Sequence, residues 1–321
     1  MKTKPTETKF ECAFGRVRQL FSRVAWLGAV ILICSSASAQ NLFVSGKNLP
    51  TNKGPGDGYG AIFRFTWDGG ESVFASGLYK PGNLTLDSAG NLFFMDYVIL
   101  EGGASGNAAV FKITPNRTLT IFAFGLSYSS KLAVDKAGKL LVADYDGGII
   151  YQYKPNGLRA NFASGLYHPS GMAFDSAGNL WVADNSIGNI YQGSIYEYKP
   201  NGKRVTFAAL DPSDRPAGLA FDSMGNLYMA DLGGKIYKYD LSAVLSPHGR
   251  TTFGSVPRSA QSLTFDGAGN LFVVDAGDAS GKGNAVYKFT LKGKRSTFAS
   301  GQASSETFSH IALQPMPVCC Q

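Results

Sequence analysis

Short apolar segments recur along the chain in groups of four, and residues that favour turns, chiefly Gly, Asn, Asp and Pro, separate them. One complete group reads GMAF at 171–174, NLWVAD at 179–184, IYEY at 195–198 and TFAAL at 206–210. Segments of this length, rich in aromatic and β-branched residues and bounded by turn residues, predict β-strands. We therefore expect an all-β chain built from a four-stranded repeat.

A nearly constant turn, DSAGN or a close variant, joins the first and second strands of each group. Its aspartates are spaced 48, 40, 47 and 44 residues apart, at Asp87, Asp135, Asp175, Asp222 and Asp266. An Asp side chain can open a type I turn, and Gly accepts the left-handed conformation that follows. The pattern predicts a tight hairpin, and a calcium-binding loop is the alternative interpretation of the same Asp and Asn residues.

The second strand of each group is apolar at nearly every position, as in NLFFMD, NLWVAD and NLFVVD. A strand with one face in water would alternate apolar and polar residues, so this strand is expected to be covered on both faces. Neighbouring copies of the repeat are the segments that can cover it. The repeats should therefore pack face to face.

The two ends of the repeat region complement each other. NLFVSG at 41–46 is a second strand that has no first strand before it, and HIALQ at 310–314 is a first strand after which the repeat stops. Such fragments make one whole unit when a chain closes into a ring, whereas an open array would be capped at both ends. The first strands also share a column of small residues, as expected where strands converge on an axis: Thr85, Ala133, Ala173, Ala220, Thr264 and Ala312.

These patterns predict a single six-bladed β-propeller of four-stranded antiparallel blades, closed by pairing of the C-terminal strand with the N-terminal blade. HPSGMAFDSAGNLWVAD at 168–184, followed by GSIYEYKPNGK at 193–203, resembles the NHL repeat. It is also similar to repeats of the gluconolactonase and senescence-marker-protein group of six-bladed propellers. The resemblance covers residues 41–314. It departs just before the third strand, where NHL repeats commonly have Arg and this chain has Ser194 and Lys235.

The first 39 residues differ in character from the repeats. Six basic residues precede an apolar run from Val24 to Cys34, and small residues ending in Ala39 follow it. This order is typical of a secretory signal, and the run is too short for a bilayer about 30 Å thick. A retained anchor and a lipid-modified Cys34 are the weaker alternatives. We expect export to the periplasm or the cell exterior, with no membrane span after cleavage.

The predicted organisation is therefore a signal over 1–39, a propeller over 40–314 and a short tail over 315–321. Removing the signal lowers the formal charge from +7 to +3. The remaining Lys and Arg residues are thinly spread, whereas nucleic-acid binding requires a basic cluster, so nucleic acid is not an expected partner. Cys319 and Cys320 in the tail are the cysteines left after cleavage, so no disulfide framework is expected inside the propeller.

Long, varied loops are expected on one face of the ring, where the second strand leads to the third and the fourth leads to the next blade. Function in a rigid scaffold usually lies on such loops. Five second strands end there in an acid: Asp96, Asp144, Asp184, Asp231 and Asp275. These carboxylates are candidates to bind a divalent cation such as calcium, or to accept backbone N–H groups and order the loop behind each strand. Their presence in every complete blade favours the second interpretation.

The resemblance also implies where a metal would lie. Gluconolactonase-type enzymes hold a divalent ion with acidic and amide residues at the variable position of a P-x-G sequence before the first strand. The matching residues here are Gly82, Ser130, Ser170, Ala217, Gln261 and Ser309, and none is a carboxylate. Hard cations prefer several anionic oxygens, so the metal site of that family is not expected.

One position further along, the chain has Asn83, Lys131 and His310 in three of its blades. His310 is the best catalytic candidate, because His titrates near neutral pH. The alternative is that His310 only tops the closing strand. No nucleophile elbow, P-loop, zinc-protease or C-x-x-C pattern is present.

Two functions follow from these observations. The first is an exported NHL-like propeller that serves as a binding scaffold for a protein, or for a small-molecule or carbohydrate ligand, through its long-loop face. Its candidate binding residues are Asn83, Lys131, Ser170, Gln261, His310 and the five strand-end carboxylates. The second is a hydrolase or lyase of the gluconolactonase-like group with an atypical site at the channel mouth. The missing carboxylates favour the first.

Overall fold

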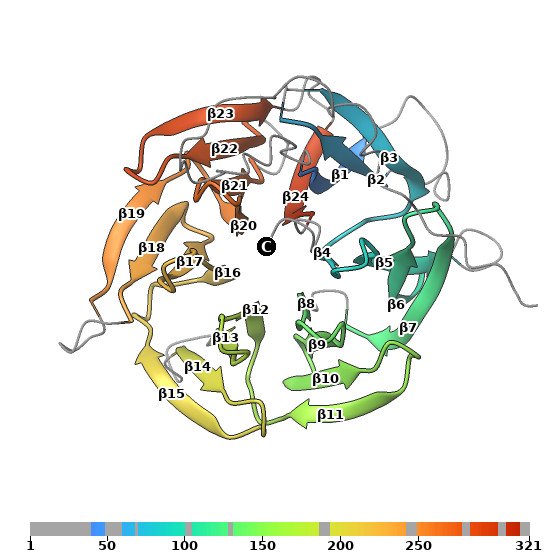
Figure 1. Ribbon diagram of the computed structural model, residues 1–321, viewed down its shortest axis with the longest axis horizontal. Helices are drawn as coiled ribbons and strands as arrows, with labels where there is room; N and C mark the ends of the chain where they lie inside the picture. Colours follow the sequence, from blue (N-terminus) through green and yellow to red (C-terminus); the bar gives the residue numbers. More distant parts are fainter. Residues whose placement is uncertain are drawn as a thin grey trace, which may run out of the picture. The chain divides into compact units, whose positions relative to one another are not determined.

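A computed structural model describes residues 40–48, 60–67, 70–99, 105–127, 131–185, 193–241, 249–277, 283–300 and 306–314. These residues form six four-stranded antiparallel sheets, which stand as blades around a common axis (Figure 1). The predicted six-bladed propeller is confirmed. The expected signal over 1–39, the tail with Cys319 and Cys320, Ser130 and parts of the long loops lie outside the described residues.

Each blade runs from an inner strand at the axis to an outer strand at the rim. The inner strands of blades one to six are β24 (Glu306–Leu313), β4 (Leu84–Leu86), β8 (Lys131–Val134), β12 (Pro169–Phe174), β16 (Pro216–Phe221) and β20 (Ala260–Phe265). The second strands are β1 (Leu42–Asn48), β5 (Leu92–Ile99), β9 (Leu140–Asp144), β13 (Leu180–Asp184), β17 (Leu227–Asp231) and β21 (Leu271–Asp275).

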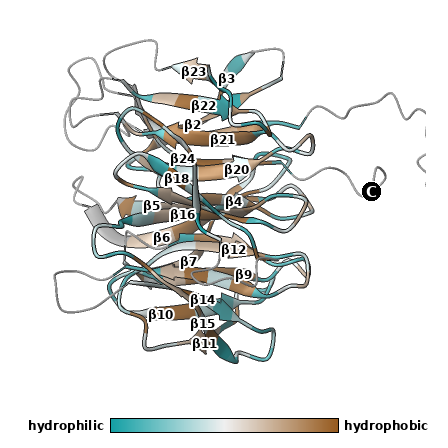
Figure 2. Cartoon of the chain, turned by 90° about the vertical axis from the view of Figure 1, so that its left-hand side faces the viewer, coloured by the Kyte–Doolittle hydropathy of each residue, from teal (hydrophilic) through white to brown (hydrophobic). Residues whose placement is uncertain are grey.

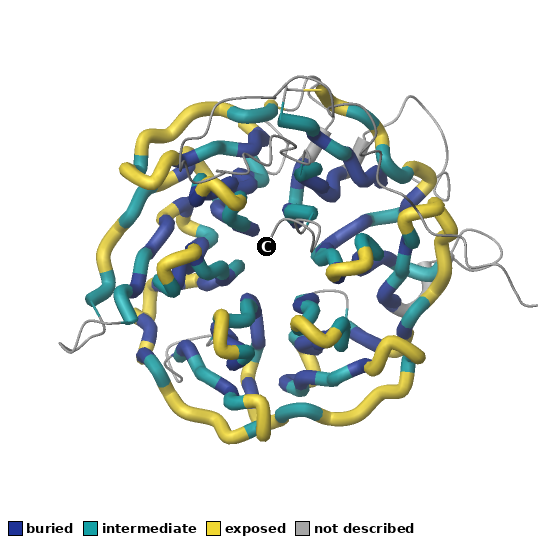
Figure 3. Tube along the Cα trace, in the orientation of Figure 1, coloured by how far each residue is buried: buried dark blue, intermediate teal, exposed yellow. Residues whose placement is uncertain are grey.

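The third strands are β2 (Gly60–Phe65), β6 (Ser105–Ile113), β10 (Ile149–Tyr153), β14 (Ser194–Tyr198), β18 (Lys235–Tyr239) and β22 (Ala285–Phe289). The outer strands are β3 (Glu71–Leu78), β7 (Leu119–Leu126), β11 (Arg159–Ala163), β15 (Arg204–Ala209), β19 (Thr251–Ser255) and β23 (Arg295–Ser300). The outer strands expose much of their length, while the second strands are largely buried, as Figure 3 shows.

The ends of the chain close the ring as predicted. Strand β24 pairs antiparallel with β1 in a register that places Leu313 opposite Leu42 and Ile311 opposite Val44. The backbone N–H of Gln314 also donates to the carbonyl of Asn41 at 2.9 Å. Blade one is thus assembled from both ends of the repeat region, which lie side by side in Figure 1.

The hydrophobic core lies between the blades. The described residues form six buried clusters, and each cluster joins two adjacent sheets. The cluster across the closing blade packs Phe308 and Phe63 of blade one against Phe272 of blade six. Hydrophobic residues, brown in Figure 2, therefore lie mainly along the strands, and the turns at the strand ends are largely hydrophilic. This arrangement explains why the second strand of each blade is apolar on both faces.

The DSAGN turns are held by their own side chains. Asp222 Oδ1 accepts the N–H groups of Met224 at 3.0 Å and Asn226 at 2.8 Å, and its Oδ2 accepts Asn226 Nδ2 at 2.7 Å. The glycine of this turn, Gly225, has a φ of 85°, in the left-handed region that favours Gly. The predicted turn is confirmed in geometry, and its Asp oxygens are occupied by the turn itself.

Two boundaries differ from the sequence prediction. The loop expected to start at Asp96 begins later, because β5 and β6 continue to pair as far as Ile99 and Ser105. The closing strand also starts before the expected His310, at Glu306. In both places cross-strand hydrogen bonds extend strands into segments that look loop-like along the chain. No helix in the described ranges is long and apolar enough to span a membrane.

Candidate functional site

The axis of the ring is an open channel of about 360 Å³, lined by the inner strands of all six blades. The column of small residues predicted to face the axis does line it: Thr85, Ala133, Ala173, Ala220, Thr264 and Ala312. Larger side chains there would meet one another, because the six strands converge. The channel therefore exists because this column is small.

A second cavity, of about 240 Å³, adjoins this channel at the long-loop end. Asn83, Lys131 and Ala217 belong to both walls, so the two spaces are continuous. Every blade contributes to the cavity, which is lined by Gly82, Asn83, Lys131, Tyr145, Ser170, Asn185, Pro216, Ala217, Leu232, Gln261 and His310. We call it the mouth cavity. It brings together five of the binding residues proposed from the sequence, Asn83, Lys131, Ser170, Gln261 and His310.

A β-bulge in the inner strand explains why two neighbouring columns line the mouth cavity. In β20, Ala260 pairs with Asp275 and Ser262 with Val274, so Gln261 is the extra residue. The same irregularity leaves Ser170 and Ala217 as extra residues in β12 and β16. A bulge re-aims side chains that would otherwise alternate across the strand. In these three blades the P-x-G position is a bulge position and lines the channel mouth, whereas Ser309, the extra residue of the bulge in β24, lies outside the lining.

Lys131 and His310 come from different blades and meet in the mouth cavity. Lys131 Nζ lies 3.3 Å from His310 Nε2. Burial lowers the pKa of Lys131 from 10.5 to about 8, and burial together with the charge of Lys131 holds the pKa of His310 well below 6.5. Lys131 is half-buried as a residue and lines the mouth cavity.

The polarity of this contact follows from the chemistry of the two groups. A lysine ammonium can only donate, so His310 Nε2 accepts and the imidazole is neutral with its proton on Nδ1. Nδ1 of His310 is buried and has no hydrogen-bond acceptor among the described residues. The hydrogen bond between the two residues therefore does not use the buried Nδ1–H of His310. It also does not use two of the three N–H groups of the Lys131 ammonium.

The other polar residues of the mouth cavity make contacts that fix the strands. Asn83 Oδ1 accepts the N–H of Leu132 at 2.8 Å and so links blade two to blade three. Ser170 Oγ donates to the carbonyl of Ala183 at 3.3 Å. Because Oδ1 of Asn83 already accepts a hydrogen bond, the Nδ2 group of its amide is the part that can donate to another molecule.

The strand-end carboxylates lie on the same face but hold the blade connections. Asp275 is completely buried and accepts N–H groups from Arg258 at 3.1 Å, Ser259 at 2.9 Å and Gly277 at 3.1 Å. Asp96, Asp184 and Asp231 accept comparable pairs or triplets of N–H groups, and Asp144 accepts one from Gly147 at 3.2 Å. Burial raises the pKa of Asp96 and Asp184, and these donors partly offset it.

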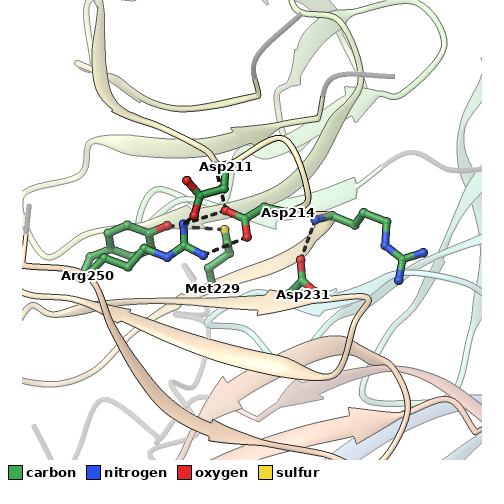
Figure 4. Close-up of polar contacts among 7 residues, drawn as sticks. Asp211, Asp214, Met229, Asp231 and Arg250 are labelled. Carbon is green, nitrogen blue, oxygen red and sulfur yellow. Dashed lines mark hydrogen bonds and ion pairs between the residues drawn. The ribbon is translucent and has the colours of Figure 1, made fainter. Parts of the chain in front are cut away.

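Most of these donors come from the connection leading into the blade rather than from the loop behind the strand. Asp231, labelled in Figure 4, accepts the backbone N–H of the residue that ends the connection from blade four, and this donor is Arg215 at 2.6 Å. Nearby, Arg250 pairs with Asp214 at 2.7 Å and Asp211 at 3.0 Å on the same connection. The sequence predicted hydrogen bonds that order the following loop, and the structure shows that the preceding connection is held as well.

A divalent metal does not fit the mouth cavity. Its described lining contains an ammonium group and no carboxylate, whereas hard cations require anionic oxygens. The described residues also contain no group of three or more His, Cys, Asp or Glu side chains arranged for a metal ion. We therefore derive no chemistry from a bound metal at this position.

Sequence reasoning did not name four residues of the mouth cavity, Tyr145, Asn185, Pro216 and Leu232. Tyr145, Asn185 and Leu232 directly follow the acid that ends a second strand, so alignment of the repeats on that acid would have found them. His168 lies outside the lining, with its ring 4.5 Å from that of Tyr145. His248 falls outside the described residues.

Comparison with known proteins agrees with this architecture. Residues 198–239, from the end of β14 to the end of β18, match the family model "Strictosidine synthase-like, N-terminal". No curated protein sequence matches the chain. A propeller in the nidogen/laminin complex is similar in structure, with 18% identity, a TM-score of 0.67, and coverage of 86% of this chain and 98% of the other. This likeness confirms the propeller fold.

Two further propellers of this kind are enzymes by description. A gluconolactonase from Xanthomonas campestris is 18% identical with a TM-score of 0.57, and the match covers 72% of this chain and 78% of the enzyme. A virginiamycin B lyase from Staphylococcus aureus, solved as an inactive variant with quinupristin, is 16% identical with a TM-score of 0.55. That match covers 82% of this chain and 90% of the lyase. At these identities the likeness establishes the propeller fold.

Proposed function

We propose that this protein is an exported propeller that binds a small ligand in the mouth cavity on its long-loop face. The observation behind this proposal is convergence: polar side chains from separate blades surround one space of about 240 Å³ that opens at the end of the channel. Ligand sites are typically concave, with a few polar groups placed among apolar ones. The signal-like N-terminal 39 residues support export to the periplasm or the cell exterior.

The strand-end carboxylates serve this function indirectly. Four of them, Asp96, Asp184, Asp231 and Asp275, tie the connection that enters their blade to the end of a second strand, so this part of the rim is fixed before a ligand binds. A preformed site loses less conformational freedom on binding than a mobile one. The carboxylates are thus positioning residues, and the mouth cavity is the contact surface.

Filling the mouth cavity should abolish ligand binding. Gln261 lines the cavity and is partly exposed, so the larger indole of Gln261→Trp is expected to occupy the space without entering the core. We expect small-molecule ligands, found by thermal shift against the wild type, to bind the variant at least tenfold more weakly. Isothermal calorimetry measures the change.

A matched substitution on the rim, Leu158→Ser, should leave the affinity unchanged, because Leu158 is 62% exposed and far from the lining in the fold, on the turn before outer strand β11. Equal affinities of the wild type and Gln261→Trp for every ligand found would contradict the proposal. Such a result would favour a protein partner bound on the outer parts of the long-loop face.

The contact between Lys131 and His310 favours a second candidate, a hydrolase or lyase. An amine with its pKa lowered to about 8, beside a neutral imidazole, can exchange a proton with a bound molecule near neutral pH. Propellers of the same fold include a lyase for which a histidine-to-alanine variant is described as catalytically inactive. Conversion of a bound ligand that is lost in His310→Ala, with binding retained, would establish this function. Binding without conversion supports the scaffold.

A further inference from the structure

The mouth cavity contains a cation that the described protein does not neutralise. Lys131 makes no ion pair among the described residues, and its one described side-chain contact is the neutral imidazole of His310. The described lining holds no Asp or Glu. A partly buried ammonium group with no anion beside it is less stable than one in water. The described lining of the cavity therefore carries a positive charge with no negative charge to balance it.

The acids nearest in the fold do not supply the missing charge. The carboxylate of Asp144, at the end of the strand paired with β8, accepts the N–H of Gly147, and its neighbours in the other blades accept N–H groups of the connections. None of them lines the cavity. Desolvation alone accounts for the lowered pKa of Lys131, as expected when no carboxylate pairs with it. The negative charge must then come from outside the described chain.

The remaining donors of the cavity suit an anionic oxygen. Asn83 uses its oxygen on Leu132, which leaves its Nδ2 hydrogens as donors, and Gln261 contributes a second amide to the lining. Amide donors beside an ammonium group are the usual partners of carboxylate and phosphate oxygens. The volume of about 240 Å³ is smaller than most drug-sized sites, so it admits a small molecule or the end of a larger one.

Building on the proposed ligand site, we infer that the mouth cavity is selective for small molecules that bear a carboxylate or phosphate group, with that group paired to Lys131. The ligand class is then an organic acid or a phosphorylated compound rather than a neutral sugar or alcohol. Pairing with such a ligand would explain why the ammonium group of Lys131 has no carboxylate partner among the described residues.

Matched charged and neutral probes test this inference. Benzoate and benzamide have nearly the same shape, and they differ in charge at the group that would meet Lys131. In NMR titrations of the labelled wild type at pH 7, we expect benzoate to bind at least tenfold more tightly than benzamide, with shifts in residues of the mouth cavity. Inorganic phosphate, as a second probe, should shift the same signals.

The variant Lys131→Met removes the ammonium group and keeps a side chain of similar length. It should weaken benzoate binding at least tenfold and leave benzamide binding within about twofold. The control variant Lys154→Met changes an exposed lysine and should leave both affinities unchanged. If Lys131→Met unfolds, Lys131→Gln repeats the test with an uncharged polar side chain.

Three results would overturn the inference: equal affinities for benzoate and benzamide, unchanged benzoate affinity in Lys131→Met, or no benzoate or phosphate shifts in the cavity at ligand concentrations on the order of 50 mM, well above the millimolar dissociation constants of weak binding. Failure of the proposed function looks different. It appears as ligand binding that survives Gln261→Trp, whereas failure of this inference leaves cavity binding intact and indifferent to charge.

Discussion

Replacing Phe308 by Ala should lower the free energy of unfolding by about 3 to 5 kcal/mol, the usual cost of removing a buried Phe side chain. Phe308 is 1% exposed and packs edge-on against Phe63 and Phe65, with ring centroids 5.9 and 6.1 Å apart. It stands in β24, whose pairing with β1 closes the ring. Urea denaturation followed by fluorescence measures the loss.

Hydrogen exchange distinguishes a weakened closure from a general loss of stability. In Phe308→Ala, amides of β1 and β24 should lose protection before those of β13, on the far side of the ring (Figure 1). The control Phe124→Ala alters a side chain that is 75% exposed, and its stability should stay within about 0.5 kcal/mol of the wild type. A Phe308→Ala protein as stable as this control would show that closure does not depend on the aromatic contact.

Replacing Lys131 by Met should raise the free energy of unfolding by about 1 to 3 kcal/mol at pH 7. The pKa of Lys131 is about 8 in the folded protein, against an ordinary value of 10.5, and each unit corresponds to about 1.36 kcal/mol. Below pH 8 the folded protein must hold an ammonium group in a site that disfavours it. Methionine removes this cost while filling a similar volume.

The sign of the pH dependence follows from proton binding. Between pH 8 and 10.5 the unfolded chain keeps the proton of Lys131 and the folded protein has released it, so the wild type gains stability as the pH rises. The advantage of Lys131→Met should therefore shrink across this range and vanish near pH 10.5. The other titratable groups of the described lining are His310 and Tyr145, which are present in both proteins.

Comparing the two proteins pairwise at each pH cancels the titration of distant groups. Burial raises the pKa of Tyr145, so its own ionisation lies above most of this range. Removal of the Lys131 charge lets the pKa of His310 rise toward 6.5, and measurements from pH 7 upward avoid that effect. A stability difference that is absent at pH 7, or constant with pH, would rule out an unpaired ammonium group. Lys154→Met, on an exposed turn, should show no such difference.

The expected gain in stability of Lys131→Met and its expected loss of benzoate binding both follow from removing one ammonium group. A residue whose removal stabilises the fold is retained for a reason other than stability, and active and binding sites are where proteins accept such a cost. If Lys131→Met is both more stable and unable to bind benzoate, the stabilisation and the loss of binding have one cause, the ammonium group at the channel mouth.

The sequence by itself determined the fold. Five DSAGN-type turns at near-constant spacing, second strands apolar on both faces, and complementary half-repeats at the two ends leave a closed ring as the architecture that buries every apolar face. The column from Thr85 to Ala312 predicted the axis, because only small residues fit where six strands converge. Repeats make such inference strong, since each position is sampled several times along one chain.

The chemistry of the site was decided by tertiary structure. Lys131 and His310 are 179 positions apart and meet because their blades face the same axis. The bulges that turn Gln261 to the mouth depend on strand pairing, and the occupation of the strand-end acids depends on N–H groups from the preceding connection. In the sequence, a carboxylate that accepts backbone N–H groups cannot be distinguished from one that is free to bind a cation. Only the positions of their neighbours in space distinguish a saturated carboxylate from a free one, or a paired lysine from an unpaired one.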